Sequence, residues 1–100
     1  MWNVFNNGLT IGTVGTENGK IIKDEEHTNG ARITLEKDAN KIPYAITCGI
    51  YGVMFHTVYS SNEVDCLQKY NCMKEDIHSI LEELNEDNVS NLISHFVDKY

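Results

Sequence analysis

Hydrophobic and polar residues alternate with a period of two through much of the first sixty residues. This period is typical of strands with one buried and one exposed face, because successive side chains of a strand point to opposite sides of a sheet. The pattern predicts five strands, at residues 9–15, 20–26, 31–37, 44–48 and 53–60. Pro43 precedes the fourth strand, where its missing N–H removes little from the ladder of hydrogen bonds.

Turn signals separate these strands. Asn-Gly pairs at 18–19 and 29–30 predict hairpin turns, since both residues tolerate the positive φ of primed turns. Residues 44–60 allow two interpretations, either one long strand or two strands joined through Gly49 and Gly52. The paired glycines favour a hairpin or a bulge.

Alternation also predicts which side chains face the core. An apolar set faces a polar set on the other side of the sheet: Leu9, Ile11, Thr13, Ile22, Ile33 and Leu35 against Lys23, Glu25, Arg32, Thr34 and Glu36. With a turn at 27–30, Ile22 pairs with Leu35, and Glu25 pairs with Arg32. Asp24 falls on the apolar face, so it needs a place at the sheet margin or a buried partner.

The stretch KDEEHTNGAR at 23–32 combines three acids, a histidine and the only arginine of the chain. We interpret it as a hairpin turn. A metal site formed by Asp24, Glu26 and His27 is the weaker alternative, because alternation sends neighbouring side chains to opposite faces. No metal site and no cofactor is predicted.

From Ser61 onward the apolar positions recur with the 3.6-residue period of helices. A helix capped by Ser61 or Asn62 is predicted, with Val64 and Leu67 facing inward and an interruption near Asn71. A second apolar stripe follows: Met73, Ile77, Ile80, Leu81 and Leu84.

The last predicted helix is capped by Asp87. Its apolar positions have nearly ideal helical spacing: Val89, Leu92, Ile93, Phe96, Val97 and Tyr100. Strands followed by amphipathic helices indicate a single α+β domain over residues 1–100. We expect a two-layer sandwich, with a mostly antiparallel sheet of about five strands in the N-terminal 60 residues packed against two or three C-terminal helices.

The net charge of −7 is unevenly distributed. Residues 1–61 hold six acids and five bases, a net charge of −1, whereas residues 62–100 hold nine acids and three lysines, a net charge of −6. Nucleic acid and anionic membranes are poor partners, because both require Lys and Arg to neutralise phosphates. A basic protein surface is the natural complement. The candidate partner-binding residues are Glu75, Glu82, Glu83 and Glu86.

The spacing of Cys48, Cys66 and Cys72 matches no zinc motif, so free thiols in a reducing compartment are expected. The chain has no run of about 18 apolar residues and no signal-peptide pattern at its start. A cytoplasmic protein is therefore expected.

Tyr44, Thr47, Cys48 and His56 form a candidate ligand-binding pocket on the last two strands. A nucleophilic Cys48 activated by His56 would require a thiolate and a reachable imidazole. In the predicted hairpin the two side chains lie on opposite faces, which favours Cys48 as a buried small hydrophobe. No catalytic residue is assigned.

Two functions are consistent with these patterns. The preferred one is a small acidic protein-binding module that is not an enzyme, for example an inhibitor or immunity-type protein that covers a basic partner surface. The alternative is a small enzyme or ligand-binding domain with a pocket near Cys48 and His56. Residues 53–60 carry apolar side chains on both faces of the predicted strand, including the face away from the helices. A second copy of the chain could cover that face, so a homodimer is also expected.

Overall fold

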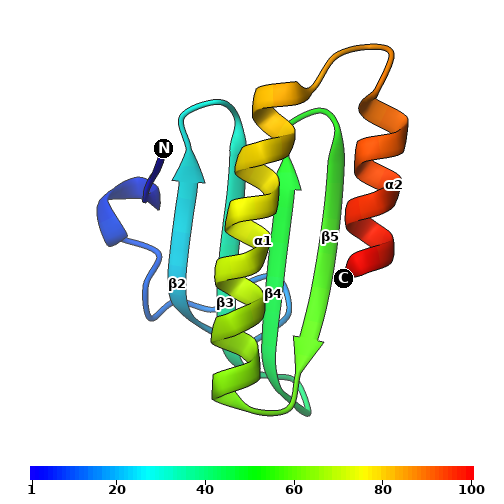
Figure 1. Ribbon diagram of the computed structural model, residues 1–100. Helices are drawn as coiled ribbons and strands as arrows, with labels where there is room; N and C mark the ends of the chain where they lie inside the picture. The colour runs from blue at the N-terminus through cyan, green and yellow to red at the C-terminus, as the bar shows by residue number, and fades with distance from the viewer.

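The computed structural model describes residues 1–100. A five-stranded antiparallel sheet packs against two C-terminal helices (Figure 1), which confirms the predicted α+β sandwich. The elements are β1 (Trp2–Val4), the 3-10 helix η1 (Phe5–Gly8), β2 (Lys20–His27), β3 (Ala31–Ala39), β4 (Ile42–Ile50), β5 (Met54–Ser60), α1 (Glu63–Glu83) and α2 (Val89–Lys99).

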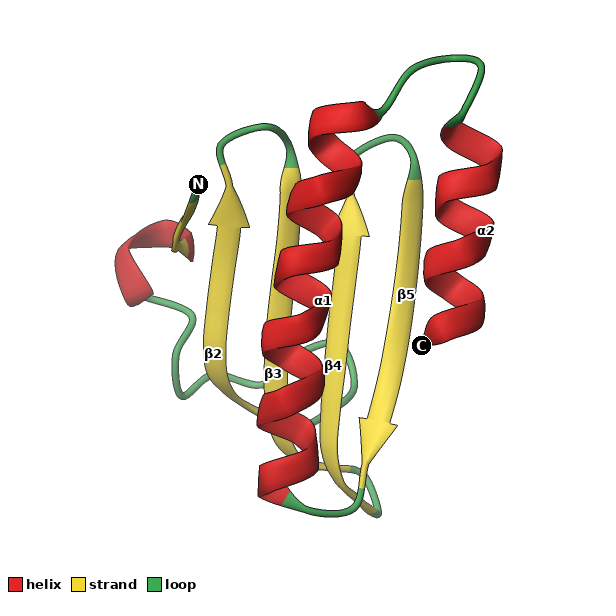
Figure 2. Ribbon diagram, viewed as in Figure 1, coloured by secondary structure: helices red, strands yellow, loops and turns green.

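The sheet is a meander in which every strand is hydrogen-bonded to its neighbour in the chain, in the order β1-β2-β3-β4-β5. Helix α1 lies along one face of the sheet, in front of β3 and β4, and α2 lies alongside β5 (Figure 2). The segment between η1 and β2 passes behind the strands, on the face away from α1 (Figure 1). This segment, residues 9–19, is called the covering loop below.

The predicted strand at 9–15 is wrong, because this segment belongs to the covering loop. Its only ladder contact is an isolated bridge between Val14 and Lys20. Gly12 has a φ of +88°, which interrupts an extended chain. The edge strand is instead β1, in which Trp2 lies opposite His27 of β2.

Both Asn-Gly pairs lie in turns, as predicted, but neither has positive φ at both residues. Asn18 has a φ of +64° in the first pair, and Gly30 has a φ of +100° in the second. The hairpin interpretation of residues 44–60 is confirmed, with the turn at residues 51–53 between β4 and β5.

A β-bulge between Ile21 and Lys23 changes the register of β2 against β3. The predicted pair of Ile22 with Leu35 is wrong, because Lys23 lies opposite Leu35. A bulge adds one residue to one strand only, so side chains beyond it point to the face opposite the one that simple alternation predicts.

Beyond the bulge, Asp24 lies opposite Thr34, and Glu26 lies opposite Arg32. The predicted pair of Glu25 with Arg32 is therefore wrong. Asp24 is also not on the helix-facing side of the sheet, where alternation had placed it. It lies on the other face, beneath the covering loop, where Thr34 is also buried.

Helix α1 begins after Asn62, whose side-chain oxygen accepts a hydrogen bond of 2.8 Å from the backbone N–H of Asp65. It continues without a break through Asn71, so the predicted interruption is wrong. Packing of its apolar side outweighs the weak helix propensity of asparagine. Val64 is 69% exposed and does not face inward as predicted. The buried positions are Cys66, Tyr70, Met73, Ile77 and Ile80.

Helix α2 is preceded by Asn88 and not capped by Asp87 as predicted. The side chain of Asn85 accepts hydrogen bonds from the backbone N–H groups of both residues. Phe96 is the only fully buried residue of α2. It therefore anchors the helix to the rest of the molecule.

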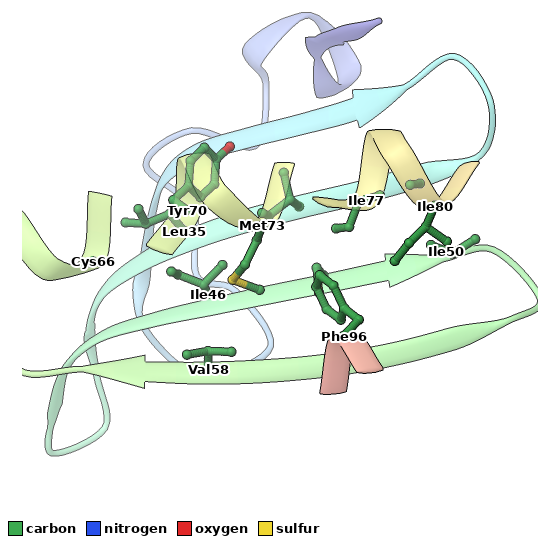
Figure 3. Close-up of a cluster of buried hydrophobic side chains, with 13 residues drawn as sticks. Leu35, Ile46, Ile50, Val58, Cys66, Tyr70, Met73, Ile77, Ile80 and Phe96 are labelled. Atoms are coloured by element: carbon green, nitrogen blue, oxygen red, sulfur yellow. The ribbon is translucent and has the colours of Figure 1, made fainter. Parts of the chain in front are cut away.

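The hydrophobic core lies between the sheet and the helices (Figure 3). Tyr70, Met73 and Ile77 of α1 point toward the sheet, and Phe96 enters the cluster from α2. Neither helix combines the length and the apolar composition that crossing a bilayer would require.

Candidate functional site

Cys48 of β4 and His56 of β5 lie directly opposite each other and therefore share the helix-facing side of the sheet. The expectation that they lie on opposite faces is wrong. It assumed a turn at residues 49–52, whereas β4 continues to Ile50 and the turn lies at residues 51–53. The shift changes the pairing by an odd number of residues, which exchanges the faces.

The environment of this pair does not activate the thiol. Burial raises the pKa of Cys48 to about 12, so the sulfur is protonated at neutral pH, whereas a nucleophile needs the thiolate. The Nε2 atom of His56 is buried without a hydrogen-bond partner, and the imidazole packs edge-on against Phe96 with ring centroids 6.2 Å apart. Cys48 therefore serves as a buried apolar residue of the core.

The other two residues of the predicted pocket lie elsewhere. Thr47 is on the opposite face of β4, with its hydroxyl 3.4 Å from that of Thr57. Tyr44 lies opposite Ser60, near the other end of β4, and packs against the core. The structure thus brings Cys48 and His56 together but separates them from the other two side chains.

A groove of about 660 Å³ lies instead between the covering loop and the sheet, within the usual range for small-molecule sites. Thr47 and Gly49 form part of its floor, Val14 lies on the loop side, and Phe55 lies on the β5 side. Arg32 is the only charged residue that lines it.

Arg32 is held in place by Asp24. The Asp24 carboxylate, whose side chain is 0% exposed, accepts hydrogen bonds from Nε (2.9 Å) and Nη2 (2.7 Å) of Arg32. It also accepts hydrogen bonds from the hydroxyls of Thr10 (2.8 Å) and Thr34 (3.1 Å). The Phe5 ring covers the guanidinium, with its centroid 3.7 Å from Cζ. Asp24 therefore has a buried partner in Thr34, one of the two possibilities raised by the sequence, and a partly exposed partner in Arg32.

Glu36 holds the other part of the covering loop. It is completely buried, although alternation predicts it on the exposed face. Its carboxylate accepts hydrogen bonds from the backbone N–H groups of Glu17 (3.2 Å) and Gly19 (3.0 Å). A Cβ atom at Gly15 would lie only 2.4 Å from Cδ of Glu36, so the loop requires glycine there. Two buried carboxylates thus fasten the loop to the sheet.

The four candidate partner-binding residues are exposed on α1 and the loop after it: Glu75, Glu82, Glu83 and Glu86. All three lysines after residue 61 are in ion pairs within the chain: Lys69 with Asp65, Lys74 with Glu25, and Lys99 with Asp76.

Of the nine carboxylates in residues 62–100, only Asp65 and Asp76 have a Lys partner. The other seven have no Lys or Arg partner: Glu63, Glu75, Glu82, Glu83, Glu86, Asp87 and Asp98. The negative charge of the helical half is therefore largely uncompensated within the chain.

His27, expected to be a turn residue, is buried at the end of β2. Its Nε2 atom lies 2.8 Å from Nδ1 of His78 on α1, and its Nδ1 atom accepts a hydrogen bond from the backbone N–H of Asn29. Asp24 points to the other face of β2, so the alternative metal site does not form. No group of three His, Cys, Asp or Glu side chains is arranged to hold a metal ion.

The sequence reasoning did not identify the residues that shape the groove. Phe5 lies in a segment for which no element was predicted, and Thr10 lies in the wrongly predicted strand at 9–15, so no hydrophobic pattern connects them with Asp24 or Arg32. Tyr70 was also missed, although its position four residues after Cys66 places it on the buried side of a helix. Its hydroxyl donates a hydrogen bond to Glu25.

Comparisons of this chain with protein-family models, curated proteins and solved structures found no match. The functional proposals below therefore rest on geometry and charge. Two surfaces carry them, the acidic outer side of α1 and the groove beneath the covering loop.

Proposed function

We propose that this protein is a small binding module whose acidic helical surface covers a basic surface of another protein, in the manner of an inhibitor or immunity-type protein. The ion-pair pattern carries this proposal. Every lysine in residues 62–100 is already paired with a carboxylate of the same chain. Seven carboxylates have no Lys or Arg partner, and one of these, Glu82, lies 2.9 Å from Nε2 of His78. Surfaces of complementary charge accelerate association and disfavour wrong partners.

The end of α1 provides a second argument. Glu82 and Glu83 lie in the last turn of the helix, which contains no basic residue. The C-terminal end of a helix carries partial negative charge, so an acid there costs about 0.3–1 kcal/mol in the isolated protein. A basic partner surface would remove this unfavourable interaction when it binds.

The backbone that carries these acids is held firmly. Glu25 of β2 accepts hydrogen bonds from the Tyr70 hydroxyl and from Nζ of Lys74 (2.9 Å), which ties α1 to the sheet. Binding to such a surface orders mainly side chains, so less conformational entropy is lost than in the folding of a flexible segment.

The proposal is tested by capture experiments with matched variants. Immobilised protein is incubated with an extract of the source cells at roughly 0.05 M and roughly 0.5 M NaCl, because the higher salt screens surface charges. We expect a basic protein to be retained at low salt and released at high salt. Its retention should be lost with E82Q/E83Q and preserved with E63Q/D98N, which removes the same charge elsewhere.

Retention that is equal at both salt concentrations, or equal for the two double variants, would contradict the proposal. The alternative function, an enzyme or ligand site at Cys48 and His56, receives no support from the protonated thiol or the unpartnered imidazole.

The homodimer is also part of the proposal. Strand β5 is at the edge of the sheet, contains no Lys, Arg, Asp or Glu, and exposes Phe55 (70%) and Tyr59 (46%). Natural edge strands usually carry charges that prevent pairing. We expect light scattering to give twice the chain mass of 11.4 kDa, and F55K to return it to 11.4 kDa. A wild-type mass of 11.4 kDa would exclude the dimer at the concentration used.

A further inference from the structure

The guanidinium of Arg32 has hydrogen-bonding capacity that the protein does not use. Its five N–H groups include two that bind Asp24, one on Nε and one on Nη2. No other acceptor is bound to the side chain, which is 35% exposed and lines the groove. The edge formed by Nη1 and the second N–H of Nη2 is therefore free.

This free edge has the geometry of a bidentate acceptor site. Two parallel N–H bonds match the two oxygens of a carboxylate, and this planar match distinguishes arginine from lysine. Asp24 and the Phe5 ring hold the guanidinium in one orientation. The donor pair is thus positioned before any ligand arrives, which lowers the entropic cost of binding.

The remainder of the groove suits an apolar body. Val14 on the loop side is 73% exposed and Phe55 on the β5 side is 70% exposed, and both line the cavity. The floor contributes Thr47, whose hydroxyl is already within 3.4 Å of another threonine. An apolar group placed between these walls would remove exposed hydrophobic surface from water.

We propose that this groove binds a small carboxylic acid with an apolar body, independently of the acidic partner surface. The carboxylate forms two hydrogen bonds with the Nη1–Nη2 edge of Arg32, and the body packs between Val14 and Phe55. Arg32 supplies the only charge among the lining residues, and no acid other than Asp24 lies within ion-pair distance of it. Tyr51 lines the groove, and its hydroxyl is bound to Glu26, which lies opposite Arg32, so the space beside Arg32 favours a small molecule over a polypeptide.

The test is a titration of the ¹⁵N-labelled full chain with 4-phenylbutyrate, followed by backbone amide chemical shifts. We expect saturable shifts at Thr34, Thr47 and Gly49. The neutral amide of 4-phenylbutyrate, 4-phenylbutanamide, should bind at least about tenfold more weakly, because hydrogen bonds between charged groups are stronger than those to a neutral amide. Absence of saturable shifts in the groove, or equal affinity for the acid and the amide, would overturn the proposal.

Two variants test whether the carboxylate binds the free Nη1–Nη2 edge of Arg32 or is attracted by positive charge in general. R32K keeps a cation beside Asp24 but lacks the second donor edge, so the affinity for 4-phenylbutyrate should fall at least about tenfold. K41Q removes an exposed base outside the groove and should bind as the wild type does. Wild-type affinity in R32K, or a matching loss in K41Q, would overturn the assignment.

A third variant avoids the buried ion pair. V14D changes a highly exposed residue on the loop side, so the fold is spared, and it places a negative charge in the groove. It should abolish the shifts at Thr47 and Gly49, and unchanged binding would contradict the proposed position of the ligand.

Discussion

Asp24 of β2 and Arg32 of β3 form a side-on ion pair with N–O distances of 2.9 and 2.7 Å on the face of the sheet away from the helices. The pair exists because the bulge at Ile21–Lys23 rotates Asp24 onto the face of Arg32. The same carboxylate binds the covering loop through Thr10. One side chain thus links two strands and the loop that forms the groove.

Replacement of Asp24 by alanine should strongly destabilise the protein. It leaves the partly buried Arg32 and two threonine hydroxyls without their acceptor, and removing one member of a buried pair costs about 3–5 kcal/mol. Urea denaturation measures the loss. The control D98A changes an exposed acid and should stay within about 0.5 kcal/mol of wild type. A D24A variant as stable as the control would show that the pair contributes little.

In the β2–β3 turn, Gly30 and Asn29 should respond differently to alanine. Gly30 has a φ of +100°, whereas Asn29 is outside the left-handed region. G30A should therefore cost about 1–3 kcal/mol through backbone strain, and N29A should cost much less. Thermal melts of both variants check this, and equal melting temperatures would remove the conformational argument.

The attachment of α2 depends on Phe96. F96A should cost about 3–5 kcal/mol, because this ring fills the core beneath the helix. V97A, on the exposed side of the same turn, should cost under about 1 kcal/mol. Chemical denaturation of the two variants compares them. Similar midpoints would indicate that α2 is held by other contacts.

Stability should fall as the pH drops below about 6.5. Burial, with the neighbouring amino terminus and His78, lowers the pKa of His27 in the folded protein. Below the ordinary histidine pKa of about 6.5 the unfolded chain therefore binds more protons, so the contribution of His27 is complete above this pH and is lost below it. Urea denaturation from about pH 5 to 7.5 should show this decrease in the free energy of unfolding for wild type and for the control H95Q, and a smaller decrease for H27Q. A slope unchanged in H27Q would assign the effect to another group.

Alkylation should distinguish the three thiols. Burial raises the pKa of Cys48 to about 12 and that of Cys66 to about 11, whereas Cys72 is exposed. Iodoacetamide at neutral pH should label Cys72 alone in the folded protein, as peptide mass mapping would show. The variant C72S should remain unlabelled until urea is added. Rapid labelling of Cys48 would restore the hypothesis of a reactive cysteine.

The parts of the fold that follow a regular period were predictable. Four of the five expected strands and most of the apolar helix positions were recovered, with Val64 and Val97 as exceptions, because burial of one side imposes the period on the sequence. The bulge at Ile21–Lys23 was not foreseen, since one additional residue leaves no compositional mark. The turn at 51–53 was misplaced for a related reason, because Gly49 lies within β4 rather than in the turn.

The candidate sites were predictable to different degrees. The exposure of Glu75 and Glu82 followed from their position opposite the apolar side of a helix. The groove could not be predicted from the sequence, because it depends on long-range contacts of the covering loop with Asp24 and Glu36. The sequence placed Asp24 on the apolar face and Glu36 on the exposed face. Only the tertiary structure shows the hydrogen-bond partners that each carboxylate has.

The meander also bears on how the chain reaches this structure. Loops of three, two and three residues join β2 to β3, β3 to β4 and β4 to β5, so each hairpin closes with little loss of chain entropy. Strand β1 is different, because fifteen residues separate it from β2. Since contacts between distant residues form slowly, the four-stranded sheet should assemble first and β1 with the covering loop should dock last. In hydrogen exchange, the amides of Trp2–Val4 would then open as a unit before those of β3 and β4.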